Sequence, residues 1–420
     1  MRNRTSLFGA ASLGAVLALA IGASAQAQET TTSWKGAPQF QNDTLTFKVR
    51  GRIYYDYVAQ DVDRAVEAGA NVDYESRSTR LRTARIGVEG TWNANWAYKA
   101  EVNFNGRDSS GADEVEWEDL ILEYKANDQT SLMLGNMKTV SLENITSSRY
   151  VTFMERGPFN DVIDAGRVLS AQAKINGVNW TIAGAVIGDS LNDNDVAVNT
   201  TTKSAKETLG GTARVTFAPI DTDTTKLHLG AWARYREAND DGLFRYRARN
   251  NTNAGDRFID SGANFDADTT LAAEAALVWN SFSVQGEYAN IEGDPASSTA
   301  AEGAAKAGYV FASWFPTGEM RRYEPAKGEF NRIKINNPMT AGGFGAVELG
   351  VRYDWVDLTE YTTLNASAGE YTAWTAGATW YPFPYVRFMA NYTKAQNENA
   401  GVSVRDVDVD TFQMRAQFDF

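Results

Sequence analysis

The chain has 420 residues, of which 43% are hydrophobic and 12% aromatic, so it can bury a large core or cover a large apolar exterior. With 40 basic and 53 acidic residues its formal charge is −13, which argues against a nucleic-acid-binding protein. It has no cysteine and one histidine, which excludes disulfides, thiolate metal sites and cysteine nucleophiles.

The N-terminus has the pattern of a secretory signal peptide. Arg2 and Arg4 precede an apolar run, and small residues with Ala-x-Ala spacing follow it. The run is about 15 residues long, whereas a membrane-spanning helix needs about 20. We therefore expect a signal peptide over residues 1–25, with a second possible cleavage point after residue 27, and a short periplasmic segment from 26 to 43. Loss of the two arginines leaves 38 basic residues against 53 acidic ones, a charge of −15.

From residue 44 onward, apolar and polar residues alternate, which is the period of β-strands. In "TLTFKVRGRIYYDYV" the apolar residues, among them Ile53 and Tyr55, fall on one face of the strand, and Lys48, Arg50 and Arg52 fall on the other. The pattern predicts an all-β protein with about sixteen strands. The expected strands are residues 44–57, 80–92, 96–105, 117–125, 131–137, 167–175, 178–187, 208–217, 226–236, 269–279, 282–289, 308–315, 346–356, 372–381, 386–394 and 410–420.

The connections alternate between short turns and long polar segments. The long ones are residues 58–79, 106–116, 138–166, 188–207, 237–268, 290–307, 357–371 and 395–409. Alternating lengths, aromatic strand ends and a last strand running to the C-terminus predict a transmembrane antiparallel β-barrel of the outer membrane, residues 44–420, closed by its terminal strands. A soluble sandwich also alternates, but its polar faces carry fewer charges. The connection from 316 to 345 is long where a short turn is expected, and one use of such a segment is to fold into the lumen.

In a water-filled barrel the polar face of each strand lines the channel. Clustered arginine and lysine side chains there favour anions by attraction and by paired hydrogen bonds to oxyanions. We expect this lumen wall to include Lys48, Arg50, Arg52, Arg80, Arg82, Arg234 and Arg236.

The segment "LFRYRARNN" places three arginines two residues apart. In an extended chain Arg245, Arg247 and Arg249 stand on one side at about 7 Å spacing, so they form a ladder along which an anion could pass. The alternative is the solvated edge of a surface loop.

Several long segments resemble the phosphate-selective porin O and P family: "GNMKTVSLENITSSRYVTFMERGPFND", "LFRYRAR", "FASWFPTGEMRRYEPAKGEFNRIKI" and "WYPFPYVRFMANYT". The resemblance implies a homotrimeric sixteen-stranded porin in the outer membrane of a Gram-negative bacterium, with phosphate or related anions and outer-membrane lipid as partners. It also implies inward-folded segments at 138–166, 237–268 and 316–345, the arginine ladder at Arg245, Arg247 and Arg249, and constriction residues at Lys138 and at Lys327 or Lys334, with Arg332 nearby.

These features favour an outer-membrane porin for passive diffusion of anions, phosphate or polyphosphate foremost, without a cofactor or metal. The alternative is a general porin whose mixed-charge lumen admits small polar solutes, in keeping with the acidic composition. A hydrolase is disfavoured because His228 is the only imidazole and no motif surrounds it. In "FMERGPFND", Glu155 and Arg156 could belong to an ion path or could pin an inward loop by a salt bridge, and we favour the second interpretation.

Overall fold

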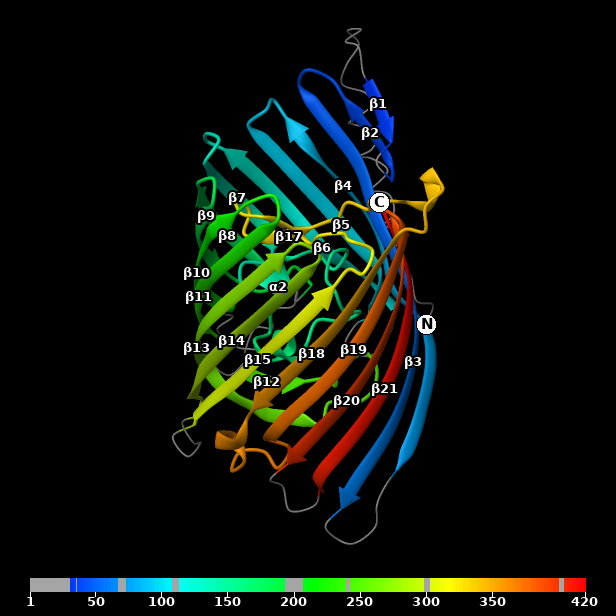
Figure 1. The fold of residues 1–420 in the computed structure, drawn as a ribbon. Helices are drawn as coiled ribbons and strands as arrows, with labels where there is room; N and C mark the ends of the chain where they lie inside the picture. Colours follow the sequence, from blue (N-terminus) through cyan, green and yellow to red (C-terminus); the bar gives the residue numbers. More distant parts are fainter. Residues whose placement is uncertain are drawn as a thin grey trace, which may run out of the picture.

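The computed structural model describes residues 31–34, 36–66, 73–107, 113–192, 207–238, 242–297, 303–399 and 404–420. The expected signal peptide lies outside them. Within this part of the chain, sixteen strands form a closed antiparallel barrel (Figure 1), which confirms the predicted fold. They are β3 (Leu45–Val66), β4 (Tyr74–Trp92), β5 (Trp96–Arg107), β6 (Asp113–Lys125), β7 (Thr130–Met137), β8 (Val168–Asn176), β9 (Trp180–Ile187), β10 (Leu209–Asp221), β11 (Thr225–Glu237), β13 (Ile259–Trp279), β14 (Phe282–Pro295), β15 (Gly303–Trp314), β18 (Ala346–Asp357), β19 (Gly369–Phe383), β20 (Val386–Asn399) and β21 (Val404–Asp419).

The last strand closes the ring on the first. β21 pairs with β3 from Val404 opposite Val66 to Asp419 opposite Arg52. Beyond the strand, Phe420 and Gly51 exchange two backbone hydrogen bonds of 3.0 Å each. Closure leaves neither terminal strand with an open edge, as a barrel in lipid requires.

Side chains alternate between the outside and the lumen as predicted. On β3, Ile53 and Tyr55 are 49% and 54% exposed, while Arg52 and Asp56 are 2% and 1% exposed. Near the short turns the outer face carries stacked aromatic rings, among them Trp279 on Phe282 with centroids 6.2 Å apart. Such aromatic rings suit a membrane–water interface, because their bodies are apolar and their edges tolerate water.

Smaller elements lie at the ends and inside the barrel. The hairpin of β1 (Thr31–Trp34) and β2 (Pro38–Gln41) precedes the barrel, and β2 pairs with β3. Inside the barrel or at its ends are α2 (Leu142–Ile145), α3 (Pro158–Val162), β12 (Phe244–Ala248), β16 (Arg322–Glu324), β17 (Glu329–Asn331), η1 (Met339–Ala341) and η2 (Thr359–Tyr361). None of the helices among the described residues is long and apolar enough to span a membrane.

Several strands extend further than the sequence predicted. β3 continues to Val66 and β4 begins at Tyr74, so most of the expected loop 58–79 is hydrogen-bonded strand. Likewise β13 begins at Ile259; its residues up to 263 pair with β12, and it pairs with the barrel strand β14 from Phe265, so residues 265–268 belong to the wall rather than to the segment 237–268 that was expected to fold inward. Beyond the apolar belt the outward face of β3 carries exposed charged residues such as Asp61 and Asp63, so the strand continues without the apolar–polar alternation that reveals it.

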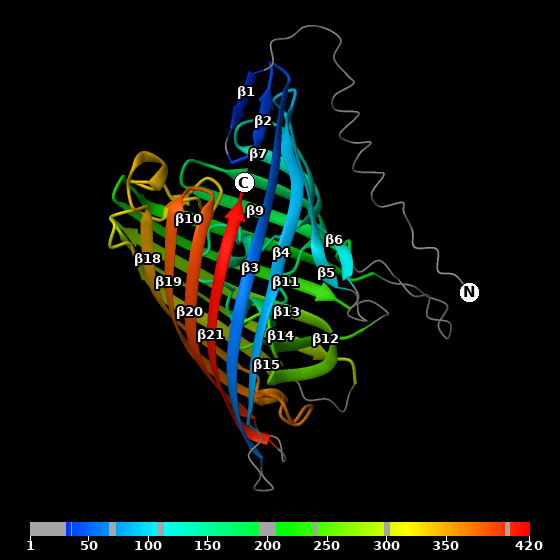
Figure 2. The ribbon, with the colours of Figure 1, turned by 90° about the vertical axis from the view of Figure 1, so that its right-hand side faces the viewer.

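The two ends of the barrel differ. One end, here called the turn end, carries the short connections together with the β1–β2 hairpin and the C-terminus, and the chain between β15 and β18 also lies there (Figures 1 and 2). At the other, here called the loop end, β3 and β20 end and β4 and β21 begin. The β16–β17 hairpin enters the interior from the turn end, since Tyr323 and Phe330 pack against the wall residues Ala276 and Val278.

Candidate functional site

The interior is filled with apolar side chains along one half of the wall. Phe153 and Phe159, from the segment between β7 and β8, pack with Tyr309 of β15, and the Phe159 and Tyr309 rings meet edge to face at 5.6 Å. Tyr246 of β12 stacks on Phe265 of β13 at 4.9 Å. This apolar cluster includes residues of β11, β13–β15 and β18–β21, so the space left inside lies mainly against the strands from β3 to β10.

That space forms two adjoining cavities. The turn-side cavity, about 280 Å³, is bounded by β3–β10, by the segment after β7 and by the β16–β17 hairpin. The loop-side cavity, about 500 Å³, is bounded by the same segment and by β12 with the residues after it. Five residues line both cavities and are called the junction: Arg82, Lys138, Asn144, Glu155 and Arg156.

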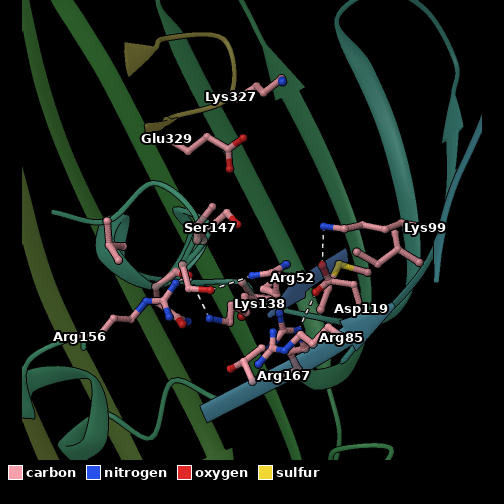
Figure 3. Close-up of a pocket in the computed structure, with 18 of the residues that line it drawn as sticks. Arg52, Arg85, Lys99, Asp119, Lys138, Ser147, Arg156, Arg167, Lys327 and Glu329 are labelled. Carbon is pink, nitrogen blue, oxygen red and sulfur yellow. Dashed lines mark hydrogen bonds and ion pairs between the residues drawn. The ribbon is translucent and has the colours of Figure 1, made fainter. Parts of the chain in front are cut away.

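The turn-side cavity is rich in cations. Figure 3 shows Lys138, Arg156 and Arg167 turned toward its floor, with Lys327 and Glu329 above them on the hairpin. Eleven basic side chains line it against three carboxylates. The basic residues are Arg52, Arg82, Arg85, Lys99, Lys138, Arg156, Arg167, Lys174, Arg214, Lys327 and Arg415, and the carboxylates are Asp119, Glu155 and Glu329.

Two cations of the junction are held by backbone carbonyls. Arg156 donates to the carbonyls of Glu143 at 2.9 Å and Thr146 at 2.5 Å, and Lys138 Nζ donates to that of Asn144 at 3.2 Å. Carbonyls orient these groups without cancelling their charge. Burial and the neighbouring Arg156 lower the pKa of Lys138 well below its usual value.

The junction carboxylate Glu155 is tied to two arginines. It accepts from Arg82 Nε at 2.9 Å and from Arg415 Nη2 at 2.6 Å, and Arg415 also pairs with Asp56. Burial opposes ionisation, but Arg82 and Arg415 hold the pKa of Glu155 well below its usual range. The contacts agree with the interpretation that Glu155 pins the inward segment to β4 and β21, and the same side chain also lines both cavities.

Helix α2 is anchored to the opposite wall by Glu287 of β14. Its carboxylate accepts from the backbone N–H groups of Leu142 at 3.0 Å and Glu143 at 2.7 Å and from the Ser141 hydroxyl at 3.1 Å. The Tyr309 hydroxyl donates to it at 2.7 Å. The first turn of a helix has no internal acceptors for its N–H groups, so a wall carboxylate satisfies them and sets the position of the segment.

Some of the expected wall cations are paired with carboxylates. Glu101, 1% exposed, lies 2.9 Å from Arg50 Nε and 2.8 Å from Arg52 Nη2. Lys48 Nζ lies 3.7 Å from Glu89, which also contacts Arg50. Of these three cations Arg52 borders the turn-side cavity. Their charge is largely offset, because each has a carboxylate within ion-pair distance.

Other expected wall arginines hold the inward segments. Arg80 donates to the carbonyl of residue 253 at 2.6 Å, and Arg234 donates to the carbonyl of residue 163 at 2.6 Å. Arg236 pairs with Asp268 at 2.9 Å and with Asp164 at 2.7 Å. These three guanidinium groups bind carbonyls and carboxylates of the inward segments, so they hold in place the segments that border the cavities. Arg82, by contrast, lies at the junction.

The three ladder arginines line the loop-side cavity. β12 pairs with β13, and its Tyr246 and Ala248 are buried while Arg245, Arg247 and Arg249 border the open space, joined by Arg257. Arg245 Nε lies 2.6 Å from Asp260. For Arg247, Arg249 and Arg257 no carboxylate of the described residues lies within ion-pair distance, although the Asp161 carboxylate accepts from the backbone N–H of Arg249 at 3.0 Å.

The expected constriction residues separate in space. Lys138 is at the junction and Lys327 lines the turn-side cavity, where it pairs with Glu324 at 2.8 Å. Arg332 pairs with Asp419 beside a small neighbouring cavity. Lys334 is exposed and lines neither large cavity.

Lumen residues outside the expected set come from several strands. Lys99, Arg167, Lys174 and Arg214 all border the turn-side cavity. Inward parity on their strands was the signal that could have identified Lys99, Lys174 and Arg214, whereas Arg167 lies just before β8 and carries no such signal. His228 is buried in the wall, with Nδ1 2.5 Å from the hydroxyl of Tyr323 on the β16–β17 hairpin, which places it in a structural contact.

Comparison with known proteins gives the family. The family described as phosphate-selective porin O and P matches residues 47–420. An uncharacterized protein of Caulobacter vibrioides is 28% identical over 408 residues, which cover 93% of this chain and 77% of that protein.

Solved structures share the fold at low identity. The anion-selective porin from Comamonas acidovorans superimposes with a TM-score of 0.53 at 12% identity, over 90% of this chain and 100% of that one. The outer membrane channel DcaP of Acinetobacter baumannii gives a TM-score of 0.52 at 12% identity, over 90% and 99% of the two chains. At such identities the likeness shows the porin barrel fold.

Proposed function

From the premise that the chain belongs to the phosphate-selective porin O and P family, we propose that it lets anions, phosphate or polyphosphate foremost, diffuse passively across the outer membrane. The protein is an outer-membrane β-barrel porin and not an enzyme. Entry is from the loop end, past the ladder arginines and through the junction into the turn-side cavity.

The observation that carries the proposal is the set of residues that the two adjoining cavities share. Both are bordered by Arg82, Lys138 and Arg156, against the one shared carboxylate Glu155, so the boundary between them has an excess of positive charge. A narrow, low-dielectric passage focuses that charge on a passing ion.

A succession of weak sites suits conduction better than one tight site. Arg247 and Arg249 on the loop side, Lys138 and Arg156 at the junction and Lys174 on the turn side are cations for which no carboxylate of the described residues lies within ion-pair distance. An anion can exchange water for guanidinium and ammonium donors at each step and still leave.

A general porin with a mixed-charge lumen is the second candidate. It is favoured by the wall carboxylates Glu101, Glu118 and Asp119, which pair with arginines and lysines along β3–β6. If these pairs dominate the field, the pore admits small polar solutes of either sign. The two candidates therefore differ in charge selectivity.

Zero-current potentials in a potassium chloride gradient across planar bilayers distinguish them. We expect anion selectivity in the wild type and a weaker preference in a variant with Arg247→Ala and Arg249→Ala. The control is Arg77→Ala, because Arg77 is 68% exposed on the outer face of β4 near the loop end. A wild-type pore that passes both ions equally, or an unchanged potential in the double variant, would contradict the proposal.

We also propose that residues 1–25 are removed on export, that the host is a Gram-negative bacterium and that the protein acts as a homotrimer. The N-terminal pattern supports the first and the family resemblance the others. The N-terminal residue of the protein extracted from outer membranes and its mass in detergent test cleavage and assembly.

A further inference from the structure

Among the three carboxylates that line the turn-side cavity, Glu329 differs in its contacts. Asp119 pairs with Arg167, whose Nε lies 2.6 Å away, and Glu155 pairs with Arg82 and Arg415. For the Glu329 carboxylate, no hydrogen bond or ion pair joins it to any residue that the structure describes. Figure 3 shows it pointing from the hairpin into the open space of the cavity. Its oxygens are therefore available to a passing solute.

The surroundings of Glu329 are cationic. Lys327, Lys174 and Lys99 are the neighbouring cations that act on its charge, and Lys174 Nζ is oriented by a hydrogen bond of 3.2 Å to the carbonyl of Lys327. Burial raises the pKa of the Glu329 carboxyl despite these lysines. Lys327 pairs with Glu324 and Lys99 with Asp119, whereas no carboxylate of the described residues lies within ion-pair distance of Lys174. An anion beside the hairpin would therefore meet the Lys174 ammonium together with the Glu329 acceptor.

An acceptor inside an anion site distinguishes oxyanions by their protons. Inorganic phosphate keeps at least one proton near neutral pH, and its P–O–H group donates a hydrogen bond that an ionised carboxylate accepts strongly. Sulfate has the same shape but no proton at that pH, so its oxygens are repelled by the carboxylate. A site of lysines alone would attract both.

We propose that Glu329 is a specificity-determining residue that accepts a hydrogen bond from protonated oxyanions and disfavours fully ionised ones. The proposal rests on the anion pathway proposed above, since Glu329 acts on a solute that the cations have drawn into the cavity. It assigns the preferred solute class, the protonated tetrahedral oxyanions.

The test is block of the chloride current through single pores in planar bilayers. The added potassium salts are phosphate and arsenate, which keep a proton at pH 7, and sulfate and selenate, which do not. For the wild type we expect block at lower concentrations of the protonated pair. In Glu329→Gln we expect the preference to fall about tenfold, which is about 1.4 kcal/mol. Glu329→Asp, which keeps the charge but withdraws it by one methylene, should fall between the two.

The matched control is Glu123→Gln. Glu123, on β6, acts on the charge of the same Lys174 but does not line the cavity. We expect this control to change block by all four anions alike and to leave their ratio as in the wild type.

Three results would overturn the assignment. They are an unchanged ratio of blocking concentrations in Glu329→Gln, an equal change of that ratio in the control, and a wild type that does not distinguish phosphate from sulfate. In those cases an anion-selective zero-current potential would leave the proposed function standing. A wild-type pore without anion selectivity would instead refute the proposed function and this inference with it.

Discussion

Replacing Lys138 with glutamine should weaken phosphate binding at the junction. Arg82, Lys138 and Arg156 face the single carboxylate Glu155 there, so the local charge falls from +2 to +1. A unit charge about 4 Å from an anion contributes about 1 kcal/mol in a water-like dielectric and about 4 kcal/mol near a protein surface. The Lys138 side chain is half-buried, so an intermediate loss of about 2 kcal/mol is expected, or roughly thirtyfold in affinity.

The measurement is the phosphate concentration that halves the chloride current, at pH 6, because a lowered pKa leaves more of Lys138 protonated at acidic than at neutral pH. The control is Lys334→Gln, because Lys334 is exposed and lines neither cavity. We expect the control to behave as the wild type. Equal blocking concentrations for Lys138→Gln and the wild type, or an equal loss in the control, would refute the electrostatic reasoning.

Three further predictions concern the same segment. Because the pKa of Lys138 lies well below 10.5, its ammonium loses a proton as pH rises through that lowered value. Phosphate block should therefore weaken as pH rises in the wild type and persist in Lys138→Arg. Glu287→Ala removes the acceptor for three donors of the α2 segment, each bond worth about 1 kcal/mol, and should increase open-channel current noise; unchanged noise would argue against this anchor. Phe153→Ala should lower the free energy of unfolding by about 3–5 kcal/mol, measured by denaturant titration in detergent, because the ring is 1% exposed within the apolar cluster.

The barrel could be predicted from the sequence because lipid and water impose a period of two on every strand. Alternation identified the outward face of Ile53 and Tyr55 and the inward face of Arg52, and the run of alternating residues to Phe420 predicted closure with β3. The same signal failed above the apolar belt, where β3 continues to Val66 with polar residues on both faces.

The candidate site was predicted in part. Parity and the repeated spacing placed Arg245, Arg247 and Arg249 together, and all three border the loop-side cavity. The sequence does not distinguish Lys327 from Lys334, which both belong to a connection without a regular period. Their different positions follow from packing of the β16–β17 hairpin against the wall.

Within the apolar belt, alternation along the chain therefore decided the direction of each strand side chain, inward or outward, because one strand suffices to establish it. Which inward cations have a carboxylate partner was decided only in three dimensions. Arg52 meets Glu101 of β5, whereas Lys138 meets a backbone carbonyl of its own loop. An ion pair requires partners within about 4 Å, and the residues that come so close are set by strand register and by loops packed inside the barrel.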